Sequence, residues 1–126
     1  DLSSGVMVKD NHIVKNMKTI EDRLLKIKNK IPIQIEIDSI NQITQTNTNL
    51  VDAFLLDNMS PTSIKQCIKK INTLKNKKQI IFIEVSGGIN LDNILKYNIK
   101  GVHGISIGAL THQSTSADIG LDQKDV

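Results

Sequence analysis

The chain has 126 residues, of which 39% are hydrophobic and 23% charged, and its formal net charge is +3 at pH 7. These values are ordinary for one globular domain with one modest core. The lysines are spread along the expected helices and only 2% of the residues are aromatic, so the sequence lacks the clustered cations and stacking rings typical of nucleic-acid-binding proteins.

The cysteine content and the hydropathy exclude several further classes. The single cysteine, Cys67, rules out an internal disulfide and a cysteine-based metal cluster. No signal peptide is found, and no apolar run approaches the about 20 residues that span a bilayer. We therefore expect a cytoplasmic protein without membrane contact. Because the sequence begins at Asp1 and is strand-like by Val6, we interpret it as a piece of a longer protein.

Apolar runs of strand length alternate with helical patterns from the start of the chain. Residues 5–8, GVMV, form the first run, and a helical pattern follows at residues 20–31. Residues 31–37, IPIQIEI, form the second run. The polar residues 38–50 come next, and they predict a helix that Ser39 can cap.

The third run, residues 52–56, leads to the clearest helix. Ser60 is a good N-cap, and Pro61 suits the first helical position. Ile64, Ile68, Ile71 and Leu74 then recur at helical spacing. The sequence therefore predicts a helix that begins after Ser60 and packs these four side chains into the core.

Three more runs complete the pattern. Residues 79–85 form the fourth run, and Asn90 would cap the helix behind it. Residues 104–107 form the fifth run and residues 117–121 a short sixth. Spacings of roughly 25 residues between strands are typical of βαβ units. The sequence thus predicts an α/β fold, an incomplete (β/α) barrel of parallel strands with outer helices, in a single domain over residues 1–126.

Polar residues or glycines close nearly every expected strand: Lys9-Asp10-Asn11-His12, Glu36 and Asp38, Asp57-Asn58, Ser86-Gly87-Gly88, and Gly108-Ala109-Leu110. A lone acidic residue after a strand is more often a helix cap than a ligand. Glu84 has a similarly plain explanation as a structural carboxylate inside the barrel mouth. Repetition at the same end of successive strands nevertheless favours a functional site, because parallel barrels collect their chemistry there.

Two glycine turns on consecutive strands suggest a phosphate site. Barrels often build such sites from the loops after the last two full strands, near a helix N-terminus. Backbone N–H groups point at the phosphate, and a Cβ would obstruct their approach. We therefore expect Gly87, Gly88 and Gly108 to provide clearance, and Gly87→Val to remove phosphate binding from a folded domain. The alternative is that Gly87-Gly88 forms only a tight turn.

Five motifs resemble a known family in their order and over almost the whole chain. They are VKDNHI (8–13), IEIDSI (35–40), LLDNMSP (55–61), IEVSGGINLDNI (83–94) and GVHGISIGALTHQSTSADIGLD (101–122). They look like the barrel domain of quinolinate phosphoribosyltransferase, also called nicotinate-nucleotide pyrophosphorylase (carboxylating). A related phosphoribosyltransferase-like family associated with molybdenum transport shares much of this domain and is the nearest alternative.

The resemblance implies a transferase of NAD biosynthesis. With Mg²⁺, the family converts quinolinate and phosphoribosyl pyrophosphate to nicotinate mononucleotide, pyrophosphate and CO₂. It implies that Lys9, Glu36 and Asp57 are catalytic and bind substrate, with Glu36 and Asp57 near the metal without direct ligation. It also implies a second set that binds the 5′-phosphate: Ser86, Gly87, Gly88, Gly108, Ala109, Leu110 and His112. His12 is expected to be structural, and His103 to lie outside the site.

Parts of the family pattern are absent from these residues. The N-terminal domain, the first barrel strands and the basic motifs that hold the quinolinate carboxylates have no counterpart here. In the family a neighbouring subunit also supplies one arginine, so we expect at least a homodimer for the complete protein. We expect residues 1–126 alone to be inactive. The alternative function is a truncated, non-catalytic module that binds phosphate or packs against a partner.

Overall fold

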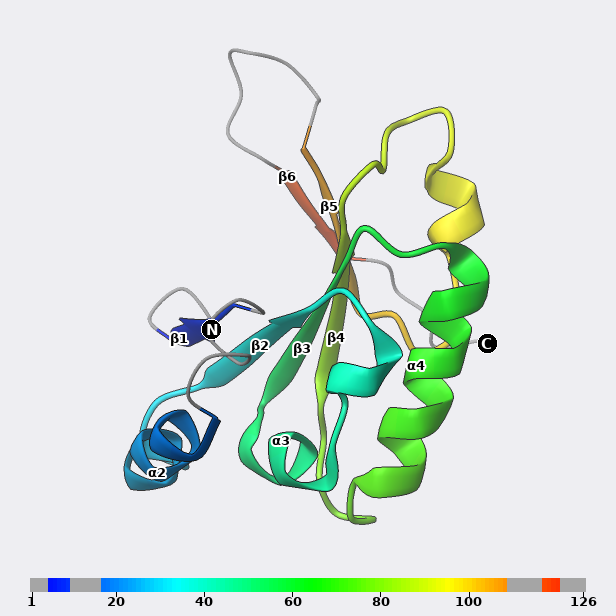
Figure 1. The fold of residues 1–126 in the computed structure, drawn as a ribbon. Coiled ribbons are helices and arrows are strands. Elements are labelled where there is room, and N and C mark those ends of the chain that lie inside the picture. Colours follow the sequence, from blue (N-terminus) through cyan, green and yellow to red (C-terminus); the bar gives the residue numbers. More distant parts are fainter. Residues whose placement is uncertain (1–4, 10–16, 109–116, 121–126) are drawn as a thin grey trace.

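The structure is a computed structural model that describes residues 5–9, 17–108 and 117–120. Six strands form one sheet, and their spatial order is the order of the sequence (Figure 1). The strands are β1 (Val6–Val8), β2 (Ile33–Ile37), β3 (Ala53–Asp57), β4 (Phe82–Ser86), β5 (Gly104–Ile107) and β6 (Ala117–Gly120). The helical elements are α2 (Met17–Ile27), η2 (Ile40–Gln42), α3 (Gln45–Leu50), α4 (Pro61–Leu74) and η3 (Ile94–Tyr97).

Strands β1 to β5 are parallel, as the sequence predicted, whereas β6 runs antiparallel to β5. A parallel return would need a crossover of about a dozen residues or more. The connection from β5 to β6, residues 108–116, is shorter than that. The expectation of an all-parallel sheet is therefore wrong for the sixth strand and correct for the first five.

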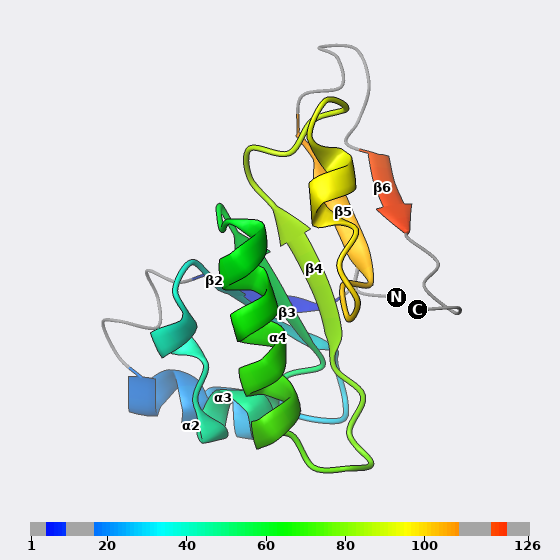
Figure 2. The same cartoon turned by 90° about the vertical axis from the view of Figure 1, so that its right-hand side faces the viewer.

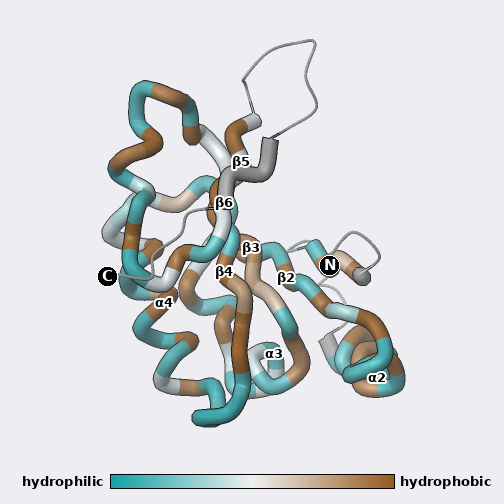
Figure 3. Tube along the Cα trace, turned by 180° about the vertical axis from the view of Figure 1, so that it is seen from behind, coloured by the Kyte–Doolittle hydropathy of each residue, from teal (hydrophilic) through white to brown (hydrophobic). Residues whose placement is uncertain are grey.

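The helices cover one face of the sheet (Figure 2). The core lies between the helices and the sheet. Its largest fully buried side chains come mainly from the strands: Phe54, Ile33, Ile35, Ile37, Ile43, Leu56, Ile64, Ile71, Ile105, Ile107, Val51 and Val85. Seen from behind, β3 and β4 have no helix in front of them (Figure 3). Because side chains alternate along a strand, the residues between these core positions point to this second face, which we call the open face.

Helix α4 follows the prediction closely. The Ser60 hydroxyl accepts a hydrogen bond from the Ser63 N–H at 3.2 Å, and Pro61 occupies the first turn. Ile64, Ile68 and Ile71 are buried, and Leu74 packs against the core from its edge. None of the helices in the described ranges is long and apolar enough to cross a membrane.

Two predicted helices differ from the structure. The helix expected over residues 38–50 is split, because Thr44 caps a new helix, α3, behind the short η2. Ser39 caps η2 as expected, through a capping box with Gln42. The helix expected from Asn90 is only a turn followed by η3. The Asn90 side chain accepts from the Asp92 and Asn93 N–H groups, as an N-cap would, but only i→i+3 backbone bonds follow.

Candidate functional site

The described residues of the predicted site gather at the carboxyl end of the parallel strands, on the open face. The register aligns Glu36 of β2 with Leu55 of β3, and Asp57 of β3 with Ser86 of β4. Lys9 directly follows β1 and is exposed. Strand alternation therefore brings Lys9, Glu36, Asp57 and Ser86 to one surface, the arrangement that the sequence analysis expected.

Asp57 and Ser86 make direct contact at this edge. The Ser86 hydroxyl donates to Asp57 Oδ1 at 3.1 Å. The next residue, Asn58, donates its backbone N–H to the Ser86 carbonyl at 2.9 Å. Both bonds join the ends of β3 and β4, so the Asp57 carboxylate is held in one orientation above the sheet.

The glycine pair after β4 has two separate structural causes. Gly87 has a φ of +86°, and a Cβ there would lie 2.7 Å from the Asn58 backbone nitrogen and 2.9 Å from Asp57 Oδ1. Gly88 has a φ of +69°, but its Cβ would meet nothing closer than Asn58 Oδ1 at 4.0 Å. Gly87 is thus required by the packing of the adjacent loop. The expectation that Gly87→Val leaves a folded domain conflicts with this crowding.

Gly108 differs from both. Its φ lies outside the left-handed region, and a Cβ there would meet no described atom within 4 Å. Neither strain nor crowding among the described residues explains this glycine, and its role in giving a ligand clearance stays a prediction. Ala109, Leu110 and His112, the rest of the predicted phosphate turn on this side, lie outside the described residues, as does His12.

Glu36 and Asp57 are the two carboxylates that were predicted to lie near the metal. Glu36 is half-buried and already has an interaction partner within the protein. Among residues 5–9, 17–108 and 117–120, no group of three or more His, Cys, Asp or Glu side chains could hold a metal ion. Glu36 and Asp57 therefore form no dedicated metal cage. This donor set fits an ion such as Mg²⁺, which is usually held by one or two carboxylates, waters and substrate phosphates.

A second polar cluster on the open face centres on Glu84, which the register places in the same row as Glu36 and Leu55. Glu84 accepts two hydrogen bonds, from Gln34 Nε2 to Oε2 at 3.1 Å and from the Ser106 hydroxyl to Oε1 at 2.5 Å. Glu84 is therefore a satisfied carboxylate, in line with its plain explanation. Neither Gln34 nor Ser106 belongs to the residues that the sequence predicted for the site. Their positions on the strands could have indicated them, because residues two apart on a strand share a face. Gln34 precedes Glu36 by two residues, and Ser106 precedes Gly108 by two.

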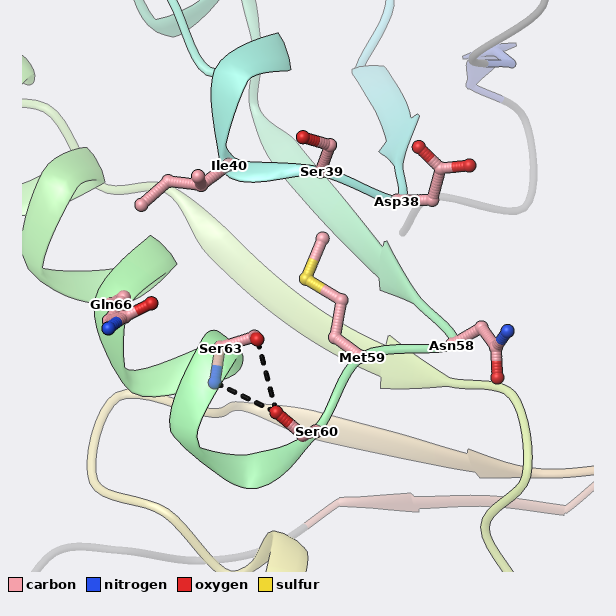
Figure 4. Close-up of a pocket in the computed structure, with 8 residues that line it drawn as sticks. All are labelled: Asp38, Ser39, Ile40, Asn58, Met59, Ser60, Ser63 and Gln66. Atoms are coloured by element: carbon pink, nitrogen blue, oxygen red, sulfur yellow. Dashed lines mark hydrogen bonds between the residues drawn. The ribbon is translucent and has the colours of Figure 1, made fainter.

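A cleft of about 280 Å³ opens beside this site (Figure 4). Its walls come from the segment after β2 and from the start of α4: Asp38, Ser39, Ile40, Asn58, Met59, Ser60, Ser63 and Gln66. Asp38 and Asn58, which close the second and third strands, line this cleft, whereas none of the residues expected to be catalytic or to bind the phosphate does. The hydroxyls of Ser60 and Ser63 bond to each other at 3.1 Å, so part of the polar lining is already satisfied.

His103 lies at the opposite end of the strands, as expected for a residue outside the site. Directly before β5, it accepts the Ile83 N–H on Nδ1 at 2.9 Å, and its ring stacks on Phe82 with centroids 5.4 Å apart. Partial burial lowers the pKa of His103 below its ordinary value. The histidine is therefore a structural element of the β4–β5 pair.

Comparison with known proteins supports the assignment that the motifs indicated. Residues 1–122 match the family model described as quinolinate phosphoribosyl transferase, C-terminal domain. A probable nicotinate-nucleotide pyrophosphorylase (carboxylating) of Methanocaldococcus jannaschii is 34% identical over 96% of this chain and 44% of its own length. The nicotinate-nucleotide pyrophosphorylase of Rattus norvegicus is 31% identical, over 96% of this chain and 40% of its own.

Solved structures agree with this. The nicotinate-nucleotide pyrophosphorylase of Ehrlichia chaffeensis is 38% identical and superposes with a TM-score of 0.69, over 97% of this chain and 43% of its own. NadC from Streptococcus pyogenes is 28% identical, with a TM-score of 0.70, over 97% of this chain and 44% of its own. The chain therefore spans less than half the length of these relatives.

Proposed function

Because residues 1–122 match its C-terminal domain, the chain belongs to the quinolinate phosphoribosyltransferase family, and we propose that the protein transfers a phosphoribosyl group to quinolinate. The pyridine nitrogen attacks the anomeric carbon of phosphoribosyl pyrophosphate, and the bond to pyrophosphate breaks. The ring carbon next to the nitrogen then loses its carboxyl group as CO₂ and takes up a proton, which gives nicotinate mononucleotide, a precursor of NAD. Residues 1–126 form part of the catalytic barrel in this proposal.

One observation supports the proposal most directly: the contact between Asp57 and Ser86 at the carboxyl end of β3 and β4. As the pyrophosphate leaves, positive charge develops at the anomeric carbon. A carboxylate fixed in advance stabilises that charge without reorganising during the reaction. Asp57 is such a group, because Ser86 and the Asn58 backbone hold the end of its strand. Glu36 lies on the same face and acts on the ribose beside it.

The 5′-phosphate occupies the two glycine turns in this proposal. Gly88 is exposed and Gly108 has open space where a Cβ would stand. Backbone N–H groups of Ser86 to Gly88 and of Gly108 to Leu110 would donate to the phosphate oxygens, and His112 would add a donor. Only η3 lies between the first turn and β5, so the amides of Ser86 to Gly88 act without the dipole of a full α-helix.

Mg²⁺ when bound neutralises the pyrophosphate leaving group. We propose that the substrate oxygens are its main ligands and that Glu36 and Asp57 contact it through water, since the described residues offer no cluster of three ligands. Lys9 is exposed at the same edge. Its ammonium group would bind the anionic oxygens of quinolinate or pyrophosphate.

The two carboxylates of quinolinate require further cations. The one arginine of the chain, Arg23, is exposed on the outer helix α2, away from the open face. We propose that arginines outside these 126 residues bind the carboxylates, and that one of them comes from a second copy of the protein. The partners are thus small-molecule substrates and another subunit.

The full-length protein tests this function directly. Incubation with quinolinate, phosphoribosyl pyrophosphate and Mg²⁺ should release nicotinate mononucleotide and CO₂ in equal amounts. Omitting quinolinate or adding a chelator should stop product formation. A well-folded full-length protein that binds both substrates but releases neither product would contradict the proposal and favour a non-catalytic module.

A further inference from the structure

The backbone ladder between β4 and β5 is short. It pairs Glu84 with Gly104 and Val85 with Ile105, and in the described part of the chain the register of these two strands ends there. Ser106 and Ile107 continue β5, but their backbone partners are in β6, Asp118 and Ala117. The carboxyl end of β5, which leads to Gly108, is therefore tied to the rest of the barrel by something other than this ladder.

A side-chain bond stands at the point where the ladder ends. The Ser106 hydroxyl donates to Glu84 Oε1 at 2.5 Å. Glu84 is held from its other side, since Gln34 Nε2 donates to Oε2 at 3.1 Å and Gln34 is only 6% exposed. Together the two bonds connect β5, through Glu84 on β4, to β2 on the other side of β3. A rotation of the Glu84 carboxylate away from Ser106 would therefore also break its bond to Gln34.

Separation between the two glycine turns decides whether one phosphate can reach both. Hydrogen bonds from backbone N–H to oxygen hold between about 2.7 and 3.2 Å and weaken steeply beyond. One turn belongs to β4, the strand of Glu84, and the other follows β5 two residues after Ser106. Without the Ser106 bond the end of β5 is held less firmly, and a shift of Gly108 relative to Gly88 would lengthen the hydrogen bonds from one turn to the phosphate.

We propose that Glu84 is a positioning residue, which through Ser106 holds the end of β5, and so Gly108, at the distance from the β4 turn that the substrate's 5′-phosphate requires. This inference rests on the proposed function. Glu84 contacts neither the substrate nor the metal in this role. Its carboxylate acts as a fixed acceptor, and Gln34 sets its direction.

The substitutions separate the acceptor from its charge. Ser106→Ala removes the bond, whereas Ser106→Thr keeps a hydroxyl on the same carbon. Glu84→Gln removes the charge but keeps an acceptor for Ser106, and its new amide can donate to Gln34 once that side chain turns its own amide over. Thr73→Ala, which deletes an exposed hydroxyl on the outer helix α4, is the matched control.

Full-length variants should be compared by KM for each substrate, by kcat, by the unfolding midpoint and by the Kd of ribose 5-phosphate in calorimetry. We expect Ser106→Ala to raise the KM for phosphoribosyl pyrophosphate and the Kd of ribose 5-phosphate about tenfold, the effect of one lost bond to a charged group. The KM for quinolinate and kcat should stay near wild type. The unfolding midpoint should fall by only a few degrees, because the lost bond also joins β4 to β5 in the folded protein. Ser106→Thr, Glu84→Gln and Thr73→Ala should retain tight binding.

Three results would overturn the positioning role. Ser106→Ala could raise the KM values of both substrates equally, or it could leave the Kd of ribose 5-phosphate unchanged. Glu84→Gln could weaken ribose 5-phosphate binding as much as Ser106→Ala does. The last would mean that the charge itself acts in the reaction. A wild type that binds ribose 5-phosphate without turning over quinolinate would refute the proposed function, and the ribose 5-phosphate titrations would still decide the role of Glu84. A wild type that does not bind this probe would refute both.

Discussion

The Ser86 hydroxyl donates to Asp57 Oδ1 at 3.1 Å, across the ends of two neighbouring parallel strands. The bond occupies one carboxylate oxygen and thereby fixes the direction of the other, Oδ2. An Asp at the end of a strand is usually free to choose among several rotamers. The bond to Ser86 fixes the rotamer of Asp57 before any substrate binds, and such preorganisation is the condition for electrostatic stabilisation of a transition state.

Asp57→Asn should separate charge from shape. An Asn at this position can still accept from Ser86 through its amide oxygen, so the loop geometry should persist. We expect kcat in the full-length protein to fall by about 10²–10³, as for loss of one preorganised electrostatic contact. The unfolding midpoint should change by no more than about 2 °C, because the side chain is not deeply buried.

A second aspartate of the same strand region provides the control. Asp52 stands just before β3, at the other end, and its Oδ2 accepts the Ile33 N–H at 2.8 Å. Asp52→Asn keeps an acceptor there and should leave kcat unchanged. Near-normal turnover of the Asp57 variant, or an equal loss in both variants, would contradict the assignment of Asp57.

Gly108 and Gly87 should respond to substitution in different ways. Gly108→Val adds atoms to open space, so we expect weaker binding of ribose 5-phosphate, by about tenfold or more, with an unchanged unfolding midpoint. Gly87→Val adds a Cβ 2.7 Å from the Asn58 nitrogen at a φ of +86°. The free energy of unfolding of this variant should be lower than that of the wild type by at least about 2 kcal/mol, because backbone strain and overpacking both destabilise the fold.

Calorimetry and chemical denaturation of the same two proteins check this contrast. Gly88→Ala is an intermediate case, since its φ of +69° is strained but the space is open. A Gly108→Val protein that binds ribose 5-phosphate like wild type would mean that the second turn does not hold the phosphate. A fully stable Gly87→Val protein would mean that the loop of Asn58 can move away.

Much of the fold could be predicted from local patterns. The strands were visible as short apolar runs, and Ser60-Pro61 predicted the start of α4. The helix expected after Asn90 does not form, although the Asn90 side chain makes the bonds of an N-cap, because only i→i+3 backbone bonds follow it in η3. The helix expected over residues 38–50 is divided because the Thr44 side chain caps α3, a cap that the sequence pattern did not reveal.

The candidate site was predicted from chemistry that repeats at one end of the strands, and its described residues do share one face. What the sequence could not supply was the cause of each glycine. Crowding at Gly87 comes from Asn58, which is distant in sequence and close only because β3 and β4 pair. The bonds of Glu84 to Gln34 and Ser106 likewise depend on register across four strands, β2 to β5.

The N-cap of α4 offers a test of stability apart from the site. Ser60→Ala removes the acceptor for the Ser63 N–H and should cost about 1 kcal/mol of unfolding free energy. Ser60→Asp should restore most of this, since Asp is an equally good cap and its charge suits the helix N-terminus. Urea denaturation at pH 7 measures both. An Ala variant as stable as wild type would show that water replaces the cap.

His103 should make stability depend on pH. Its Nδ1 accepts the Ile83 N–H, so this nitrogen must be unprotonated in the folded state. Partial burial lowers the pKa of His103 below its ordinary 6.5. The unfolded chain therefore binds a proton more readily than the folded chain. The contribution of His103 is complete above pH 6.5 and is lost as the pH falls through 6.5 toward the lower folded pKa.

His103→Asn isolates this contribution, because the Asn side-chain oxygen can accept the same N–H but does not titrate. The unfolding midpoint of the wild type should fall more between pH 7.5 and pH 5.5 than that of the Asn variant, two values chosen on either side of the ordinary histidine pKa. His103→Ala should lose stability at both pH values, since the Ile83 N–H then lacks its side-chain acceptor. Parallel pH profiles for wild type and His103→Asn would mean that this histidine keeps its proton affinity on folding.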